Sequence, residues 1–310
     1  MASKFIKLVI LAGITGLAGF LSGGCSSPEV KRNPTADEIF EKSFDLRIEN
    51  EDKLVVPEEL KEEVWNYMVE RLVDDKSFIK SLDPALDSYW MDEYFSDIYF
   101  DTPELDMLNR QSGIRSRKRI NFTDPTNKKS GRQLVQVKIN DIDDNMRNRG
   151  EIKFEVEFPP RGNSADDKHP VLGMIVPSER DEFKRLMAEI DIDPYSLKKV
   201  LVNEQRRRSL YITRSGGQFI SIRLDECSSE KLWVKWSHVE LEPELNETPY
   251  TMADSAGRAY MENSNQAIID DIMAKFPAVK QDLTPKYNKA FGYFEKKIPF
   301  FRTLFKYGII

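Results

Sequence analysis

Several strand-length segments of this chain carry charged residues on one face and apolar residues on the other. Residues two apart in a β-strand share a face, so Glu49, Glu51 and Lys53 lie on one face of the first such segment, residues 47–56. Later segments repeat the pattern, with charged faces formed by Arg115, Arg117 and Arg119; by Glu151, Lys153, Glu155 and Glu157; by Glu204, Arg206 and Arg208; and by Glu240 and Glu242. One charged face is ordinarily solvated, but so many of them favour a closed sheet whose charged faces turn inward.

The number of such segments indicates the architecture. Further strand-like stretches run at 95–100, 113–121, 133–139, 151–158, 199–213, 217–225 and about 232–242, which gives about eight strands. Gly216-Gly217 predicts a hairpin turn between two of them. Apolar residues at helical spacing predict helices near 57–72, 178–190 and 265–276. We therefore predict an α+β fold, an antiparallel β-barrel with helices packed outside.

The charge balance narrows the class of partner. The chain has a formal net charge of −6, which argues against general nucleic-acid binding. Basic residues still cluster at 110–132 and 204–214. A local anion site is thus compatible with an acidic protein.

The N-terminus has the features of a bacterial export signal. Lys4 and Lys7 precede an apolar run, Leu8 to Phe20, that is short for a spanning helix and ends in Leu-Ser-Gly-Gly-Cys25. We predict a lipoprotein signal peptide at 1–24, lipidation of Cys25 and a tether at 25–43; the alternatives are an ordinary cleaved signal and an uncleaved anchor. The expected location is the bacterial cell envelope, lipid-anchored and facing the periplasm. Lipidation leaves Cys227 as a lone thiol, without an internal disulfide.

The region after the barrel, predicted at 44–247, differs in composition. Residues 248–310 are rich in aromatic side chains towards their end, including Phe300, Phe301, Phe305 and Tyr307. One interpretation is a helical extension that covers the outside of the sheet. The other is an exposed surface for a protein partner or a membrane.

The order of these motifs resembles the CYTH-like, or triphosphate tunnel metalloenzyme, superfamily over residues 44–290. The first-strand signature Glu-x-Glu-x-Lys is matched by Glu49, Glu51 and Lys53, and Tyr99-Phe-Asp-Thr-Pro103 precedes an arginine strand as in the family. The remaining matches are Lys138, Arg206, Arg208, Leu224-Asp225, Glu240, Glu242 and Lys286-Tyr287. The VTC-type polyphosphate-polymerase branch shares the Tyr-Phe-Asp-Thr-Pro element, so the subfamily stays open. Lys153 among the acids of its strand leaves open which of Glu151, Glu155 and Glu157 faces the lumen.

The resemblance implies a lumen that binds triphosphate with a divalent cation, Mg²⁺ or Mn²⁺. Carboxylates suit these hard cations, and arginine and lysine suit phosphate oxygens. By resemblance, phosphate is bound by Arg115, Arg117, Lys138, Arg206 and Arg208; metal by Glu49, Glu51, Glu240 and Glu242; and catalysis falls to Glu49, Glu51 and Lys53. For each residue the alternative is an ion pair without chemistry.

Three functions remain open at this point. The first is a metal-dependent triphosphatase acting on triphosphate or short inorganic polyphosphate. The second is a binding protein for polyphosphate or another polyanion without turnover, and the third is a structural envelope lipoprotein. An exported protein does not meet the cytosolic ATP pool, which disfavours the nucleotide-dependent reactions of the family.

Overall fold

The computed structural model describes residues 47–121, 131–140, 148–157 and 162–310. The predicted signal peptide, Cys25 and the tether at 25–43 lie outside the described residues. The expected domain boundaries at 24 and 43 therefore stay predictions. None of the described helices is both long and apolar enough to cross a membrane.

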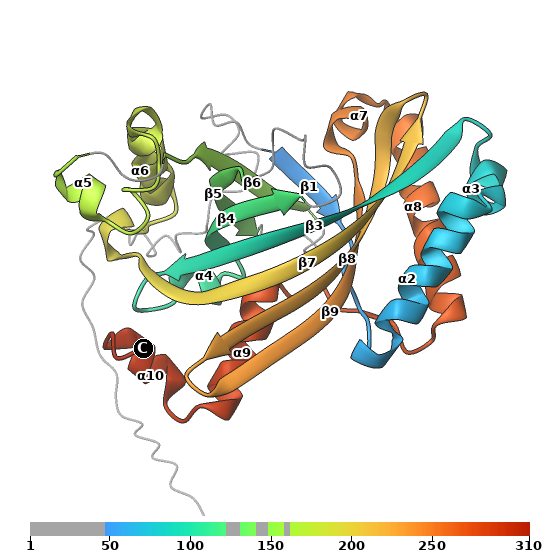
Figure 1. Cartoon of the computed structure of the whole chain (residues 1–310). Helices are drawn as coiled ribbons and strands as arrows, with labels where there is room; N and C mark the ends of the chain where they lie inside the picture. Colours follow the sequence, from blue (N-terminus) through green and yellow to red (C-terminus); the bar gives the residue numbers. More distant parts are fainter. Residues whose placement is uncertain (1–46, 122–130, 141–147, 158–161) are drawn as a thin grey trace, which may run out of the picture. The chain divides into compact units, whose positions relative to one another are not determined.

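One antiparallel sheet closes on itself to form a barrel (Figure 1). Around the barrel the strands follow the order β1-β6-β5-β4-β3-β7-β8-β9, and the pairing of β1 with β9 closes the ring, while β2 and β10 extend from β9. The strands are β1 (Arg47–Glu51), β2 (Leu54–Val55), β3 (Leu86–Asp101), β4 (Gly113–Asn121), β5 (Gln133–Asn140), β6 (Asn148–Glu155), β7 (Lys198–Arg214), β8 (Gly217–Lys231), β9 (Val234–Leu245) and β10 (Lys280–Gln281). The predicted α+β fold with an antiparallel barrel of about eight strands is confirmed.

Three details of the predicted strands were wrong. The first segment is interrupted at Asp52 and Lys53, which separate β1 from β2. The strand expected at 95–100 has 16 residues, Leu86–Asp101, because it pairs with β7 along its whole length. The hairpin turn lies at Ser215-Gly216, both with positive φ (51° and 84°), one residue earlier than predicted.

Most of the helices, though not α9, cover the outer face of the barrel (Figure 1). They are η1 (Glu58–Leu60), α2 (Lys61–Val69), the π-helical turn η2 (Glu70–Asp74), α3 (Ser77–Leu82), α4 (Asp106–Asn109), α5 (Ala165–Lys168), η3 (Pro177–Glu179), α6 (Arg180–Glu189), η4 (Pro194–Ser196), α7 (Glu247–Met252), α8 (Ser255–Lys275), α9 (Lys286–Lys297) and α10 (Phe301–Lys306). The apolar outer faces of the strands find their partners in these helices.

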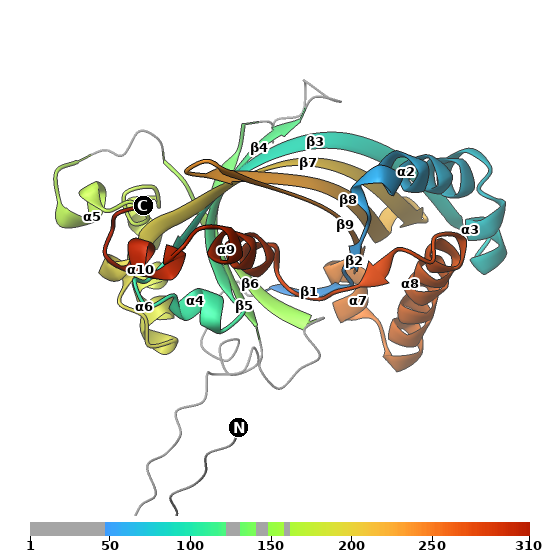
Figure 2. The same cartoon turned by 90° about the horizontal axis from the view of Figure 1, so that it is seen from below.

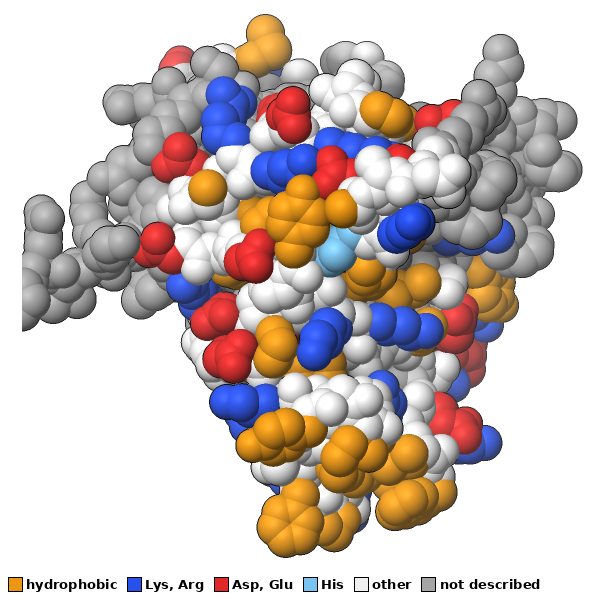
Figure 3. All heavy atoms as spheres, turned by 90° about the vertical axis from the view of Figure 1, so that its left-hand side faces the viewer, with side chains coloured by type: hydrophobic (Ala, Val, Ile, Leu, Met, Phe, Trp, Pro, Cys, Tyr) orange, Lys and Arg blue, Asp and Glu red, His pale blue; other side chains and the backbone are white. Residues whose placement is uncertain are grey.

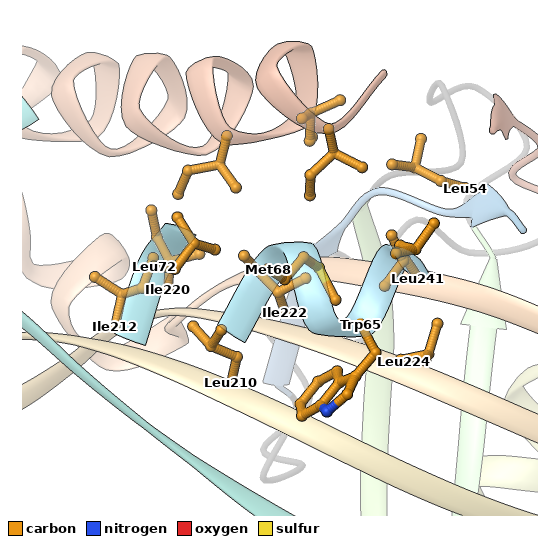
Figure 4. Packing of buried hydrophobic residues seen from close by; sticks show 14 of the residues in the cluster. Leu54, Trp65, Met68, Leu72, Leu210, Ile212, Ile220, Ile222, Leu224 and Leu241 are labelled. Carbon is orange, nitrogen blue, oxygen red and sulfur yellow. The ribbon is translucent and has the colours of Figure 1, made fainter. Parts of the chain in front are cut away.

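The largest apolar cluster lies between the sheet and helices α2 and α8 (Figure 4). Met68 and Leu72, from the helix predicted near 57–72, are buried in one cluster with Leu210 and Ile212 of β7 and Leu241 of β9. A second cluster packs α6 against β4, β5 and β6, with Phe154 and Phe183 in edge-to-face contact. Because the apolar faces point outward, the opposite, polar faces line the lumen.

Helix α9 lies at one end of the lumen rather than on the outside of the sheet (Figure 2). The ring of Tyr287, in its first turn, stacks on Tyr99 of β3 with centroids 5.0 Å apart. The Tyr287 hydroxyl donates to Asp101, which also accepts the backbone N–H groups of Met107 and Leu108. The Tyr-Phe-Asp-Thr-Pro element thus joins β3, α4 and α9.

Candidate functional site

The barrel encloses a cavity of about 710 Å³ lined mainly by charged side chains. All eight strands of the ring contribute, and α9 adds Lys286. Its charged lining is Glu49, Glu51, Lys53, Glu93, Arg115, Arg117, Arg119, Arg132, Lys138, Arg149, Glu151, Lys153, Glu155, Glu179, Glu182, Arg207, Arg223, Glu242, Glu244, Glu247 and Lys286. Such a lining has the charges to bind a polyanion together with a cation.

On one wall, Asp97 holds the arginines of β4. This fully buried carboxylate accepts Nε and Nη2 of Arg117 at 2.7 and 2.6 Å and Nη1 of Arg115 at 3.3 Å. The ring of Phe95 lies 4.4 Å from the Arg117 guanidinium carbon, a cation–π distance. Burial opposes the charged form of Asp97, but Arg117 and Arg115 outweigh it and lower its pKa. Asp97 therefore fixes both guanidinium groups on the lumen wall, and sequence reasoning did not identify this acid.

On the opposite wall, Lys53 lies between two glutamates. Its Nζ is 2.5 Å from Glu51 and 2.6 Å from Glu242. Burial alone lowers the pKa of Lys53, but Glu242 and Glu51 raise it to about 12. Lys53 therefore stays charged and orients the two carboxylates.

A deeper group of charges surrounds Lys286 at the start of α9. Its Nζ contacts Asp225 of β8 and lies 3.0 Å from Glu240 and 2.8 Å from Glu242. Arg207 of β7 binds the same Asp225 through Nε at 2.7 Å and reaches Glu242 at 2.6 Å. Lys286 and Asp225, from the Lys-Tyr and Leu-Asp elements of the sequence, are thus in direct contact.

The β6 strand contributes Glu151 as its buried acid. Glu151 contacts Lys153 and lies 4.0 Å from Lys138, whose Nζ also bonds Glu49. Burial opposes ionisation of Glu151, but Lys138 and Lys153 outweigh it and lower its pKa to about 2. Glu155 also lines the cavity but is exposed, and Glu157 lies beyond the strand, so Glu151 is the acid of these three that is buried in the lumen.

Two predicted phosphate ligands lie outside the lumen. Arg206 pairs with Asp92 at 2.8 Å, and Arg208 pairs with Glu62 of α2 at 2.8 Å, on the outer face of β7. Because Arg206, Arg207 and Arg208 are consecutive, the sequence did not show which of them face inward. The prediction that Arg206 and Arg208 face the lumen was wrong. The sequence held a signal, because Leu210 and Ile212 have the same parity and pack under the outer helices. The inward residue is Arg207, which was missed.

The predicted metal ligand Glu240 faces inward but lies apart from the cavity lining. It is fully buried and its carboxylate meets Lys286, Lys289 and His238, each within 3.0 Å. Burial opposes its ionisation, but Lys286 and the His238 hydrogen bond outweigh it and lower the pKa of Glu240. This carboxylate is already neutralised by protein cations.

Glu244, which sequence reasoning missed, is the counterpart of Glu51 across the β1–β9 pairing. Burial raises the pKa of Glu244 to about 7; Arg223 in contact with it lowers the pKa, while Glu49 and Glu51 raise it further. The acids on β1 and β9 therefore repel one another in the absence of a further cation.

A divalent cation fits near Glu49, Glu51 and Glu244 only if the bound phosphate ligand supplies part of its coordination. Among the described residues, no three His, Cys, Asp or Glu side chains are arranged to close on one metal ion. Mg²⁺, however, commonly uses one or two carboxylates together with substrate phosphates and water. Glu49, Glu51 and Glu244 supply carboxylates of that kind, and their mutual repulsion favours a cation among them.

Comparisons with known proteins give structural likeness and no sequence match. No protein family and no curated protein matches the chain. A proposed adenylate cyclase from Bacillus halodurans shares 14% identity with a TM-score of 0.48 over 79% of this chain and 98% of its own. A protein from Pyrococcus horikoshii shares 15% sequence identity with a TM-score of 0.44, and the match covers 79% of this chain and 99% of that one. A third match is a proposed adenylyl cyclase from Hippeastrum, which is described as having a dominant triphosphatase activity. It shares 13% sequence identity with a TM-score of 0.41, and the match covers 79% of this chain and 95% of that one. Since all these TM-scores are below 0.5, the fold assignment rests on the strand topology of this chain.

Proposed function

We propose that the lumen binds triphosphate or short inorganic polyphosphate with a divalent cation and hydrolyses its terminal phosphoanhydride bond. The convergence of Arg115, Arg117, Lys138, Arg207 and Arg223 from four strands on one cavity carries this proposal. Guanidinium forks match phosphate oxygens bidentately, and the backing carboxylates hold the forks in place before a ligand arrives. Preorganised charge of this kind suits phosphoryl transfer, where catalysis is mostly positioning and electrostatic stabilisation.

The carboxylates of β1 and β9 form the second half of the proposed site. Glu49, Glu51 and Glu244 would hold a divalent cation, Mg²⁺ or Mn²⁺, which supplies charge neutralisation at the phosphate oxygens when bound. Lys53 fixes the orientation of Glu51 through its 2.5 Å contact. In the proposed reaction the oxygen of a water attacks the terminal phosphorus, a carboxylate of Glu49 or Glu51 accepts the water proton, and the bridging oxygen leaves with the shortened chain.

The alternative is a binding protein without turnover, and one observation favours it. Glu51 and Glu242 are each held by lysines at 2.5–2.8 Å, and Glu49 is held by Lys138. A carboxylate committed to an ammonium group is a weaker proton acceptor. The same lumen would then serve as a receptor for polyphosphate.

We further propose membership of the CYTH-like superfamily and attachment to the cell envelope. The motif order and the barrel topology support the first. The lipobox-like segment ending at Cys25 supports the second, with the domain facing the periplasm. In this proposal residues 44–247 are the tunnel domain and 248–310 its extension.

Phosphate release from tripolyphosphate, measured with and without Mg²⁺ or Mn²⁺, tests the proposed function. Metal-dependent release is the expected result. Arg117→Ala removes a charge-assisted fork worth about 1.5–3 kcal/mol, so tripolyphosphate binding weakens roughly ten- to a hundredfold. Binding without release identifies the receptor, whereas a parent protein that neither binds nor hydrolyses tripolyphosphate refutes the site assignment and leaves the structural lipoprotein.

Mass spectrometry of the mature chain tests the anchor. A lipid-modified N-terminal Cys25 is expected, with Cys25→Ser released or unprocessed. An unmodified Cys25, or a mature chain that starts elsewhere, contradicts it.

A further inference from the structure

Exposed apolar side chains gather at one end of the described barrel, in two short segments. Ten large hydrophobic residues are exposed among those that the structure describes, and five of them lie at the β8–β9 turn or beside α10. These five, the end patch, are Leu232, Trp233, Phe300, Tyr307 and Ile309. Trp233 and Phe300 are 74% and 80% exposed. Figure 3 shows hydrophobic side chains gathered at the lower end of the face it displays.

The two segments are neighbours in space. Val234 of β9 and Ile310 both pack on the apolar cluster that contains Trp236, Ile298 and Phe305. Figures 1 and 2 both place the β8–β9 turn close to α9 and α10. The end patch is therefore one surface built on a buried apolar cluster.

The backbone presents the tips of this surface outward. Leu232 and Phe300 adopt left-handed conformations, with φ of 54° and 58°. Such angles are uncommon for bulky residues, for which glycine is the unstrained choice. Phe300 gains almost no burial in return, so its placement is not explained by the packing of this chain.

The two segments that carry the end patch are rich in positive charge. Residues 231–235 and 296–310 contain six cations and no acid, in a chain of net charge −6. The cations are Lys231, Lys235, Lys296, Lys297, Arg302 and Lys306. Three of them have an acidic neighbour from outside the segments: Lys235 with Glu230, Arg302 with Glu295 and Lys306 with Glu104. The surface keeps an excess of three positive charges.

We propose that the end patch docks on an anionic lipid surface. Aromatic side chains that project from tips, next to lysines, suit the membrane interface, where rings sit at headgroup depth and cations meet anionic lipids. A protein partner would need roughly 800 Å² of complementary surface, which two projecting tips do not form by themselves. The inference is separate from the proposed lumen function and from lipidation of Cys25.

Site-specific labelling of the full chain tests the docking. In a Cys25→Ser background, an environment-sensitive fluorophore is attached at Trp233→Cys, at Phe300→Cys, or at Met252→Cys; Met252 is 82% exposed on α7, outside the end patch, and Cys227 is buried. With phosphatidylglycerol vesicles, emission at 233 and 300 should shift to the blue and be quenched by brominated lipid, while 252 stays water-like. Equal quenching at 252, or water-like labels at 233 and 300 on vesicle-bound protein, overturns the proposal. So does a blue shift that grows with protein concentration without vesicles, because it indicates a second copy as the occupant.

Neutralising the lysines tests the electrostatic part. Lys296→Gln and Lys297→Gln should each weaken docking about fivefold, since a basic residue near an anionic surface contributes about 1 kcal/mol. Lys118→Gln, an exposed lysine on β4, is the matched control and should leave docking unchanged. A loss of the same size in the control, or none in the two variants, overturns the role of this charge.

Discussion

Asp97 and Arg117 form a bidentate ion pair across β3 and β4, with nitrogen–oxygen distances of 2.7 and 2.6 Å, and the carboxylate is fully buried. The same carboxylate receives Arg115 at 3.3 Å. One buried acid on the inner face of β3 thus fixes two guanidinium groups that line the lumen. Its loss would leave the buried Arg115 and the partly buried Arg117 without their shared counterion.

We predict that Asp97→Asn lowers the free energy of unfolding by about 3–5 kcal/mol, the usual cost of removing one partner of a buried ion pair. Chemical denaturation of parent and variant measures it. Asp87→Asn is the control, because Asp87 pairs with Lys76 on the surface, where such a pair contributes about 0–1 kcal/mol. Similar losses in the two variants would show that the Asp97 cluster is not a stabilising unit.

Arg206 and Arg207 are sequence neighbours on opposite faces of β7, so they form a matched pair. Arg207→Lys keeps a charge beside Asp225 and Glu242 but removes the planar fork, and tripolyphosphate affinity should fall about tenfold. Arg206→Lys should leave the affinity unchanged. Calorimetric titration compares them, and a larger effect at Arg206 would contradict the orientation of this strand.

The barrel was predictable because its evidence is local. Alternation of Glu49 and Glu51, or of Arg115 and Arg117, fixes which face each residue occupies, and a period of two survives any strand pairing. The alternation gives no answer where neighbouring residues are of one type, as in Arg206-Arg207-Arg208, because both faces of the strand then carry a charge. It also fails where position depends on distant partners. The roles of Asp97 and Glu244 come from neighbours on other strands.

Glu240 shows a further limit of pattern reading. Its parity with Glu242 correctly predicts an inward side chain. Its neutralisation, however, comes from Lys286 and Lys289 on a helix whose docking at the end of the lumen no local pattern specifies. The sequence therefore predicts which strand residues line the lumen better than it predicts the helix α9 that lies at its end.

Glu244 predicts a pH dependence of stability. Its folded-state pKa of about 7 lies above the ordinary value of 4.5, so between these values the folded state binds the extra proton. The contribution of Glu244 to stability is therefore greatest at low pH and falls as pH rises from about 4.5 to 7, by up to about 3 kcal/mol. The free energy of unfolding of Glu244→Gln relative to the parent should thus rise over this range.

Parallel denaturation curves at pH 5, 6 and 7 measure this difference. Glu59→Gln, at an exposed position of η1, serves as the control and should show a pH-independent difference. If the Glu244→Gln difference is constant as well, the carboxyl does not titrate in this range.

Glu49→Gln tests the cation half of the proposed site. Glutamine keeps the size of Glu49 but removes the charge that a hard cation requires, while Lys138 loses the nearer of the two ionic partners that it has among the described residues. In the parent, Mg²⁺ should strengthen tripolyphosphate binding and support phosphate release. In the variant, release should fall about tenfold or more, and the strengthening by Mg²⁺ should largely disappear.

The matched control for Glu49→Gln is Glu204→Gln, on the outer face of β7, where the carboxylate accepts a hydrogen bond from Ser96 at 2.8 Å. This change removes the same charge from the protein but not from the lumen. Titrations of tripolyphosphate with and without Mg²⁺ separate binding from turnover, so the outcome is informative for an enzyme and for a receptor. If Mg²⁺ acts equally on parent and Glu49→Gln, the cation is bound elsewhere, and the carboxylates of β1 serve only to orient the lysines.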